Sequence, residues 1–158
     1  ILHGGGQQKG LRSGTENVPA ACGFALAAEM IHKRMGTNRS NARKLRTIII
    51  EGLARTFEPG QYAVNSPDNG YEGILNVAFP RVKAQVLMHH LEAENIFVSV
   101  GSACSSHKNA TSHVLKAMNL PKENVEGAIR LSFSGMNTEQ EAIRFLEVIP
   151  KIIPAIRY

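Results

Sequence analysis

The stretch Ala128-Ile129-Arg130-Leu131-Ser132-Phe133 alternates apolar and polar side chains, as a β-strand with one buried face does. Successive side chains of a strand point to opposite faces, so Ile129, Leu131 and Phe133 share one face. Arg130 lies on the other face, where its guanidinium is suited to bind a carboxylate. This stretch therefore predicts a sheet and places a candidate binding residue on it.

The run Gly101-Ser102-Ala103-Cys104-Ser105-Ser106 places a cysteine among small and polar residues, after the apolar stretch Ile96-Phe97-Val98. A cysteine that serves packing usually has bulky apolar neighbours. We therefore expect Cys104 at a strand end, on a loop that can move. Together with Arg130, such a thiol suggests chemistry on a small substrate that carries a carboxylate, although an exposed structural thiol is the alternative from the residues alone.

The bulk composition indicates one domain, because 158 residues with 43% hydrophobic content can bury a sizeable core. No apolar run has the length of a membrane span, and no signal-peptide pattern is present. The chain starts at Ile1 and its first residues read like the middle of a protein, so we expect further sequence before it. Two cysteines, Cys22 and Cys104, are too few for a disulfide framework, which indicates a reducing cytosol. We expect Cys22 to be packed as a small apolar residue in a helix.

The net charge of +5 and the pI near 9.5 permit an acidic partner without requiring one. Much of the excess charge lies between residues 33 and 46, where we expect a solvated helix face. A docking patch for an acidic protein or an RNA is the alternative. No aromatic residues interleave with these charges, so direct nucleic-acid binding is not expected. The basic residues are Lys33, Arg34, Arg39, Arg43, Lys44 and Arg46.

Periodicity predicts helices and strands in mixed order. A helix capped by Asn17 is expected to run to about Met35 and to be interrupted by Gly36, before a second helix. Further helices are expected around residues 86–91 and 112–118, and a last helix follows the capping box 138–141 until Pro150 and Pro154 kink or end it. Strands are expected at 62–64, 74–79, 96–100 and 128–133. This order predicts an α/β fold, a small sheet covered by helices in a two-layer sandwich.

Several segments resemble, in order, the cysteine desulfurases of the class V branch of fold-type I pyridoxal-phosphate enzymes. Gly4-Gly5-Gly6-Gln7-Gln8-Lys9-Gly10-Leu11-Arg12-Ser13-Gly14-Thr15 is similar to the family's glycine-rich segment, and 74–79 to its N-x-x-F strand. Residues 102–106 resemble the catalytic-cysteine loop, with 113–118 and 129–132 completing the series. The serine-rich loop is similar to that of the iron–sulfur-assembly (NifS/IscS-like) group.

The resemblance implies the small domain of a fold-type I transferase, with a mostly antiparallel sheet. Residues 1–16 would be the tail of the segment that links to a large cofactor domain, and 17–158 the small domain. The family's Schiff-base lysine lies upstream of the glycine segment and has no counterpart here, so residues 1–158 alone should be inactive. One departure is Ser134-Gly135-Met136, where many relatives carry Gly-Arg.

The implied reaction converts L-cysteine to L-alanine with pyridoxal phosphate as cofactor, and the sulfur is carried as a persulfide on Cys104. The resemblance implies that Arg130 binds the substrate carboxylate. Asn76 contacts the substrate or braces the cysteine loop, unless it is a satisfied buried amide. Thr15 and Arg12 would reach the cofactor phosphate of a homodimer's second subunit, or Ser13-Gly14-Thr15 merely caps the first helix.

The implied partner is a sulfur-acceptor protein, such as an iron–sulfur scaffold, and RNA thiolation is a second possible use of the sulfur. His107 follows Cys104 by three positions, but two ligands do not make a metal site, so none is expected. A non-catalytic sulfur-relay or dimerisation module with the same fold is the alternative, and another class V aminotransferase or lyase is a third possibility. A His-Lys pair upstream in the parent chain would favour the enzyme.

Overall fold

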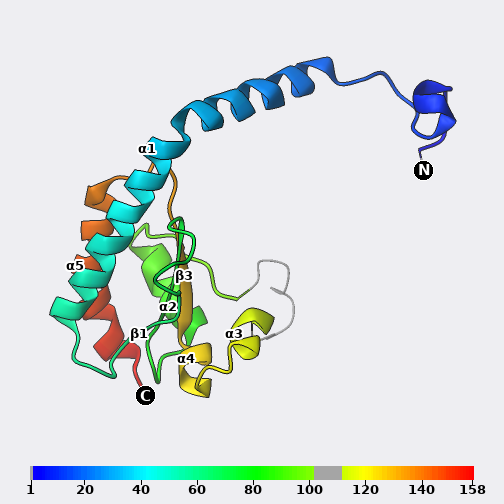
Figure 1. The fold of residues 1–158 in the computed structure, drawn as a ribbon. Coiled ribbons are helices and arrows are strands. Elements are labelled where there is room, and N and C mark those ends of the chain that lie inside the picture. The colour runs from blue at the N-terminus through cyan, green and yellow to red at the C-terminus, as the bar shows by residue number, and fades with distance from the viewer. Residues whose placement is uncertain (1, 102–111) are drawn as a thin grey trace. The chain divides into compact units, whose positions relative to one another are not determined.

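The computed structural model describes residues 2–101 and 112–158. They fall into two compact units, Ile1–Gly36 and Thr37–Tyr158. The elements, drawn in Figure 1, are the short turn η1 (Gln7–Gly10), α1 (Val18–Thr56), β1 (Ala63–Val64), β2 (Ile74–Ala78), α2 (Ala84–Ala93), α3 (His113–Ala117), α4 (Lys122–Glu126), β3 (Ala128–Ser132) and α5 (Glu139–Ile156). The assignment of 1–16 to a linking segment and of 17–158 to a small domain remains a prediction.

Helix α1 begins as predicted and continues where a break was expected. The Asn17 side chain accepts a hydrogen bond from the Ala20 N–H at 3.1 Å, which caps the first turn. The predicted interruption at Gly36 is wrong, because α1 runs through it to Thr56. An exposed glycine costs a helix only about 1 kcal/mol relative to alanine. The helix formers on both sides of Gly36 outweigh that cost.

The two halves of α1 differ in burial. Every residue from 18 to 36 is exposed, including Cys22, so the expectation that Cys22 is packed is wrong. Leu45, Ile49 and Leu53 are at most 2% exposed. Their spacing of four residues puts them on one face of the helix. This second half of α1 belongs to the unit that contains the sheet.

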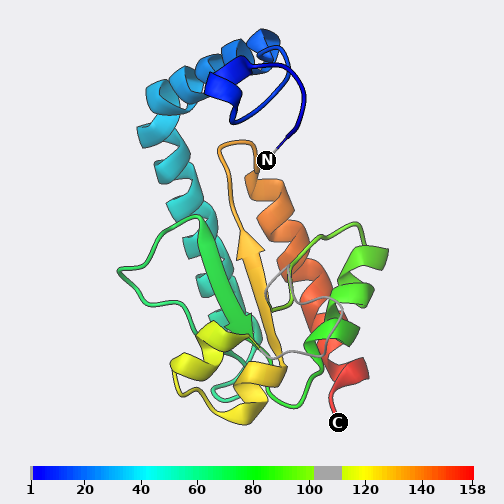
Figure 2. The same cartoon turned by 90° about the vertical axis from the view of Figure 1, so that its right-hand side faces the viewer.

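The sheet is antiparallel, with the strand order β1-β2-β3. One face contributes Leu75 and Val77 from β2 and Ile129 and Leu131 from β3 to the main core. Residues of the second half of α1, of α2 and of α5 complete that core, and Figure 2 shows α5 running alongside β3. The prediction from the alternation of residues 128–133 is therefore confirmed: the apolar side chains of β3 are buried and Arg130 lies on the opposite face.

Among residues 2–101 and 112–158, helices cover the opposite face of the sheet at one end only. Ala78 and Ala128 are buried there with Leu115 of α3, and Val125 of α4 packs against this small cluster. Alanine side chains let the two short helices approach closely. The described remainder of this face carries Asn76, Arg130 and Ser132 together with the partly exposed Ile74. The predicted fold class, a small antiparallel sheet covered by helices, is confirmed.

One expected strand is absent from the described residues, one helix was not predicted, and the two prolines do not end the last helix. Residues 96–100 form no strand; only Ser99 bridges to β3, at Arg130. Helix α4 was not predicted, because five residues are too few for a periodic signal. Pro150 and Pro154 lie inside α5 and do not end it before Ile156. Burial of the residues around them, such as Ile149 and Ile153, compensates for the backbone hydrogen bonds that proline cannot make.

Other predicted boundaries hold. Ser112 caps α3 by accepting a hydrogen bond from the Leu115 N–H. Thr138 and Glu141 form the predicted capping box at the start of α5.

No helix in the described part of the chain has the length and apolar character needed to cross a membrane.

The basic residues of α1 are largely engaged within the chain. Glu72 is 8% exposed. Its carboxylate accepts hydrogen bonds from Arg39 Nε at 3.0 Å and from Arg43 Nη2 at 2.7 Å. Arg46 is buried and donates to the carbonyl oxygen of Pro67 at 2.8 Å, so it does not belong to a solvated face. Lys44 pairs with Glu139 at 2.7 Å. The contacts of Arg39, Arg43 and Arg46 attach the connection between β1 and β2 to α1, and the Lys44–Glu139 pair joins α1 to α5.

The carboxylate of Glu72 should make folding stability acid-sensitive. Hydrogen bonds from Arg39 and then from Arg43 lower its pKa from the ordinary 4.5 to about 2. A carboxyl whose pKa falls on folding stabilises the fold above its unfolded pKa, and this contribution is lost as pH falls through the folded value. We expect urea unfolding to show a steeper loss of stability between pH 4.5 and 2 for the wild type than for Glu72→Gln. Parallel curves for the two proteins would contradict this.

Gly127 joins α4 to β3 at a point of close backbone approach. A Cβ atom there would collide with the carbonyl oxygen of Phe79 and would lie 3.1 Å from that of Val82. The Phe79 N–H also donates to the Gly127 carbonyl oxygen at 3.1 Å. Neither backbone carbonyl can move away without disturbing the sheet.

Gly127→Ala should therefore destabilise the protein by about 1–3 kcal/mol, the usual cost of overpacking. Gly36→Ala is the matched control, because nothing lies within 4 Å of its added Cβ and alanine is the better helix former. That control should stabilise α1 by up to ~1 kcal/mol. Urea unfolding measures both changes, and equal effects of the two substitutions would refute the steric explanation.

Candidate active site

Four polar side chains form a row across the open face of the sheet. The register pairs Val64 with Val77 and Asn76 with Arg130. The Asn65 N–H donates to the Asn76 carbonyl oxygen at 2.9 Å, which extends the pairing by one residue beyond β1. Ser99 bridges to Arg130 on the other side of β3. In-register residues of antiparallel strands share a face, so Asn65, Asn76, Arg130 and Ser99 lie side by side; we call them the polar row.

Arg130 is held on the strand by its neighbour Ser99. The backbone N–H of Arg130 donates to the Ser99 carbonyl oxygen at 2.7 Å, and the Ser99 N–H returns a bond at 3.1 Å. Arg130 Nη2 donates to Ser99 Oγ at 3.3 Å. Its Nε is buried and has no hydrogen-bond partner among residues 2–101 and 112–158. A buried donor without a partner costs free energy, which a bound anion would recover.

Asn76 is the neighbour of Arg130 on β2. Its Oδ1 accepts a hydrogen bond from Asn65 Nδ2 at 2.7 Å. Its backbone N–H donates to Ser66 Oγ at 2.8 Å. Among the residues that the structure describes, its Nδ2 takes part in no hydrogen bond. The centre of the polar row therefore presents a guanidinium and an amide next to each other.

The other predicted catalytic residue lies outside the described part of the chain. Cys104 follows Ser99 by five positions, and His107 lies three positions further on. The structure describes the chain up to Gly101, whose φ of 67° suits glycine. The roles of Cys104 and His107 remain predictions.

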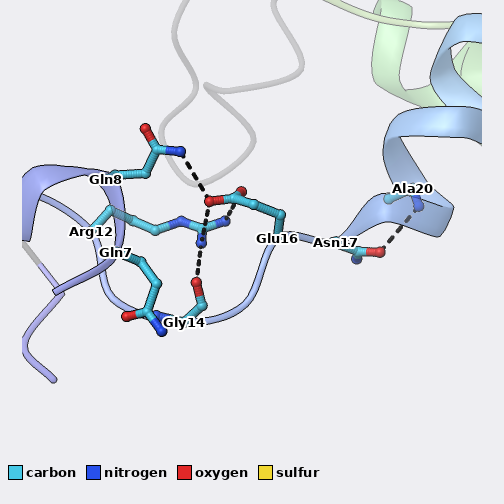
Figure 3. A network of polar contacts seen from close by, with 7 residues as sticks. All are labelled: Gln7, Gln8, Arg12, Gly14, Glu16, Asn17 and Ala20. Atoms are coloured by element: carbon cyan, nitrogen blue, oxygen red, sulfur yellow. Dashed lines mark hydrogen bonds and ion pairs between the residues drawn. The ribbon is translucent and has the colours of Figure 1, made fainter. Parts of the chain in front are cut away.

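Arg12 and Thr15 lie in the other unit, within the turn that precedes α1. Arg12 Nη1 donates to the Gly14 carbonyl oxygen at 2.8 Å, and Nη2 pairs with Glu16 at 3.2 Å. Gln8 donates to the same Glu16 carboxylate at 3.1 Å, as Figure 3 shows. Thr15 is exposed. The charge of Arg12 is thus balanced by Glu16, and Thr15 is accessible to a ligand.

Two residues of the polar row were not predicted from the sequence. Asn65 directly follows the predicted strand 62–64, and Ser99 lies in the apolar stretch 96–100. Either could have been placed beside Asn76 or Arg130 only from the pairing register. An isolated asparagine after a strand is otherwise read as part of a turn.

No group of three or more potential metal ligands occurs among residues 2–101 and 112–158. A separate cavity of about 430 Å³ lies near the start of α5. Its lining includes Leu131 and Phe133 from the core side of β3, and none of the polar row. Its charged residues are already engaged, since Arg144 pairs with Glu94 and Glu141 completes the capping box. The polar row is therefore the better candidate site.

The polar row lies on the sheet of a chain whose residues 4–145 match the class-V aminotransferase family. The chain belongs to that family. Within it, the chain is similar to cysteine desulfurase IscS 1 of Archaeoglobus fulgidus, with 39% identity over 99% of this chain and 41% of the relative. It is 37% identical to cysteine desulfurase IscS of Methanosarcina thermophila, over 99% of this chain and 38% of that protein. The resemblance to cysteine desulfurases is thereby confirmed.

Solved structures agree with this assignment. A NifS-like protein superposes with a TM-score of 0.81 at 32% identity, over 99% of this chain and 39% of the other. A NifS-like protein from Rickettsia africae gives a TM-score of 0.78 at 29% identity, over 99% of this chain and 40% of that one. The chain thus spans about two fifths of the length of these relatives.

Proposed function

We propose that this chain is the small-domain part of a pyridoxal-phosphate-dependent cysteine desulfurase, which converts L-cysteine to L-alanine and carries the sulfur on Cys104. The observation that carries the proposal is the buried Arg130 Nε, which has no hydrogen-bond partner among the described residues and lies beside Asn76 in the polar row. Ser99, which bonds to Arg130 in the same row, precedes Cys104 by five positions. The similarity to cysteine desulfurases supports it.

The polar row would hold the carboxylate of the substrate. Arg130 supplies the charge, and its buried Nε is a donor that a carboxylate oxygen would satisfy. Asn76 would add an amide N–H from the neighbouring strand. Because both side chains stand on hydrogen-bonded strands, they would fix the orientation of the substrate as well as its charge.

Pyridoxal phosphate, when bound, supplies the electron sink for breaking the carbon–sulfur bond. The residues here fit part of its site. Thr15 is exposed and offers a hydroxyl to the phosphate, whereas Arg12 already pairs with Glu16. We therefore assign the direct phosphate contact to Thr15, with Arg12 maintaining the conformation of the segment. As in the sequence prediction, the contact would be made across a homodimer.

Cys104 would act as the sulfur acceptor. Its thiolate attacks the sulfur of the substrate cysteine, forming a sulfur–sulfur bond while the carbon–sulfur bond breaks. The electron pair of the broken bond stays with the carbon, which is protonated to give alanine. L-Cysteine and the Cys104 thiol thus become L-alanine and the Cys104 persulfide.

The remaining roles follow from the same proposal. Residues 1–16 would belong to the segment leading to a large cofactor domain, and 17–158 to the small domain. The persulfide would be passed to an acceptor protein such as an iron–sulfur scaffold, or used in RNA thiolation, in the cytoplasm. Neither membrane attachment nor direct nucleic-acid binding is part of the proposal.

The deciding experiment uses the full-length polypeptide that contains residues 1–158. It is incubated with pyridoxal phosphate and L-cysteine and digested with a protease in the absence of reductant. The mass of the peptide that contains Cys104 is then measured by mass spectrometry. We expect the mass of one additional sulfur atom on that peptide. Cys104→Ser should abolish both this mass and alanine production, while Cys22→Ser, which removes the other cysteine, should change neither.

Alanine production with an unmodified Cys104 peptide would make Cys104 a bystander. Absence of both products would favour a non-catalytic module with the same fold. Residues 1–158 alone should produce no alanine, since the family's Schiff-base lysine has no counterpart in them.

Arg130→Lys should raise the KM for L-cysteine by about 10- to 100-fold, the value of a charge-assisted hydrogen bond of roughly 1.5–3 kcal/mol. Lysine keeps the charge but loses the planar pair of donors. Steady-state kinetics measure the change, with Arg55→Lys, an exposed residue of α1, as the matched control. An unchanged KM would remove Arg130 from the substrate site.

A further inference from the structure

The amide of Asn76 has a defined orientation in the polar row. Asn65 Nδ2 donates to its Oδ1 at 2.7 Å, so the oxygen faces β1. The Nδ2 group is then left for the other side, where Arg130 is the cross-strand neighbour. A ligand between Asn76 and Arg130 would meet N–H donors from both residues. Such an arrangement suits a carboxylate and repels a cation.

This orientation is opposite to the one that Arg130 alone would favour. A guanidinium attracts a carbonyl oxygen, so without Asn65 the amide of Asn76 would turn its Oδ1 toward Arg130. That turn would place an acceptor where a substrate carboxylate has to bind. The hydrogen bond from Asn65 therefore decides whether this position carries a donor or an acceptor.

Asn65 is itself held firmly enough to impose the orientation. Asn65 is only 8% exposed, so its side chain has little freedom to turn toward water. Its backbone N–H donates to the Asn76 carbonyl oxygen at 2.9 Å, and the adjacent Ser66 Oγ accepts from the Asn76 N–H at 2.8 Å. The two residues are thus linked through backbone and side chains at once.

We infer that Asn65 is a positioning residue for the substrate carboxylate, acting through the hydrogen bond that turns the Asn76 N–H groups toward Arg130. The inference rests on the proposed function for the identity of the substrate. It assigns Asn65 no contact with the substrate. Asn65 instead determines whether the oxygen or the nitrogen of the Asn76 amide faces the substrate carboxylate.

The variant that tests this is Asn65→Asp, which has nearly the same shape but cannot donate. An aspartate accepts a hydrogen bond from Asn76 Nδ2, so it should hold the amide in the reversed orientation. Asn65→Ala leaves the amide free to adopt either orientation. Asn69→Asp is the matched control, because it adds the same charge to an exposed position in the same connection.

The first readout is the side-chain amide resonance of Asn76 in the nitrogen-labelled protein, titrated with 3-mercaptopropionate. This compound carries a carboxylate and a thiol but no amine, and 2-mercaptoethanol is the probe without the carboxylate. We expect the resonance to shift with the first compound only, in the wild type and in Asn69→Asp. The shift should be lost in Asn65→Asp. A shift retained in Asn65→Asp, or absent from the wild type, would overturn the inference.

The second readout is the KM for L-cysteine in the cofactor-loaded full-length protein. Asn65→Asp should raise it by about tenfold, with a smaller rise in Asn65→Ala and little change in kcat. A purely structural role predicts the reverse order, since the near-isosteric aspartate fills the space that alanine leaves empty. That reverse order would contradict the inference, and urea unfolding of each variant excludes a global loss of structure.

The two readouts separate this inference from the proposed function. Carboxylate binding at Asn76 requires no sulfur transfer, so the resonance test stands even if no persulfide forms on Cys104. Conversely, persulfide formation with an Asn76 resonance insensitive to 3-mercaptopropionate would retain the desulfurase and remove Asn65 from its site.

Discussion

The antiparallel register of β2 and β3 is the constraint on which the rest of this structure depends. Pairing Leu75 with Leu131 and Asn76 with Arg130 puts two leucines in the core and two polar residues on the opposite face. The same hydrogen-bonded ladder thus builds the hydrophobic core and sets the spacing of the candidate site. In the described part of the chain, α1, α2 and α5 pack on one face, and α3 and α4 pack on the other face where Ala78 and Ala128 leave room.

The sequence was sufficient for features that rest on a short, strong local pattern. The alternation of residues 128–133 and the capping box at Thr138 needed no knowledge of the rest of the chain, and both are present in the structure. The interruption at Gly36 was predicted from residue type alone. In the structure the helix continues, because an exposed glycine in a long helix carries only its small intrinsic cost.

Features that depend on pairing between distant segments could not be derived in this way. Ser99 makes a single bridge to Arg130, which leaves no periodic signature in residues 96–100. Asn65 acquires its role only when β1 is aligned with β2, two segments separated by an irregular connection. Of the candidate site, the sequence therefore indicated Arg130 and Asn76 but not the neighbours that hold them. The placement of Thr15 and Arg12 at a cofactor remains a prediction.

The position of Arg130 also has a consequence for how this chain avoids misfolding. A strand that paired one residue out of step would carry its arginine into the core and expose Ile129 and Leu131. Burying an unpaired guanidinium costs several kcal/mol, so the misaligned sheet would be strongly disfavoured. Arg130, which we propose binds the substrate, thus also discriminates between alternative pairings of the chain. Selection for ligand binding and selection for a unique fold would then act on the same side chain.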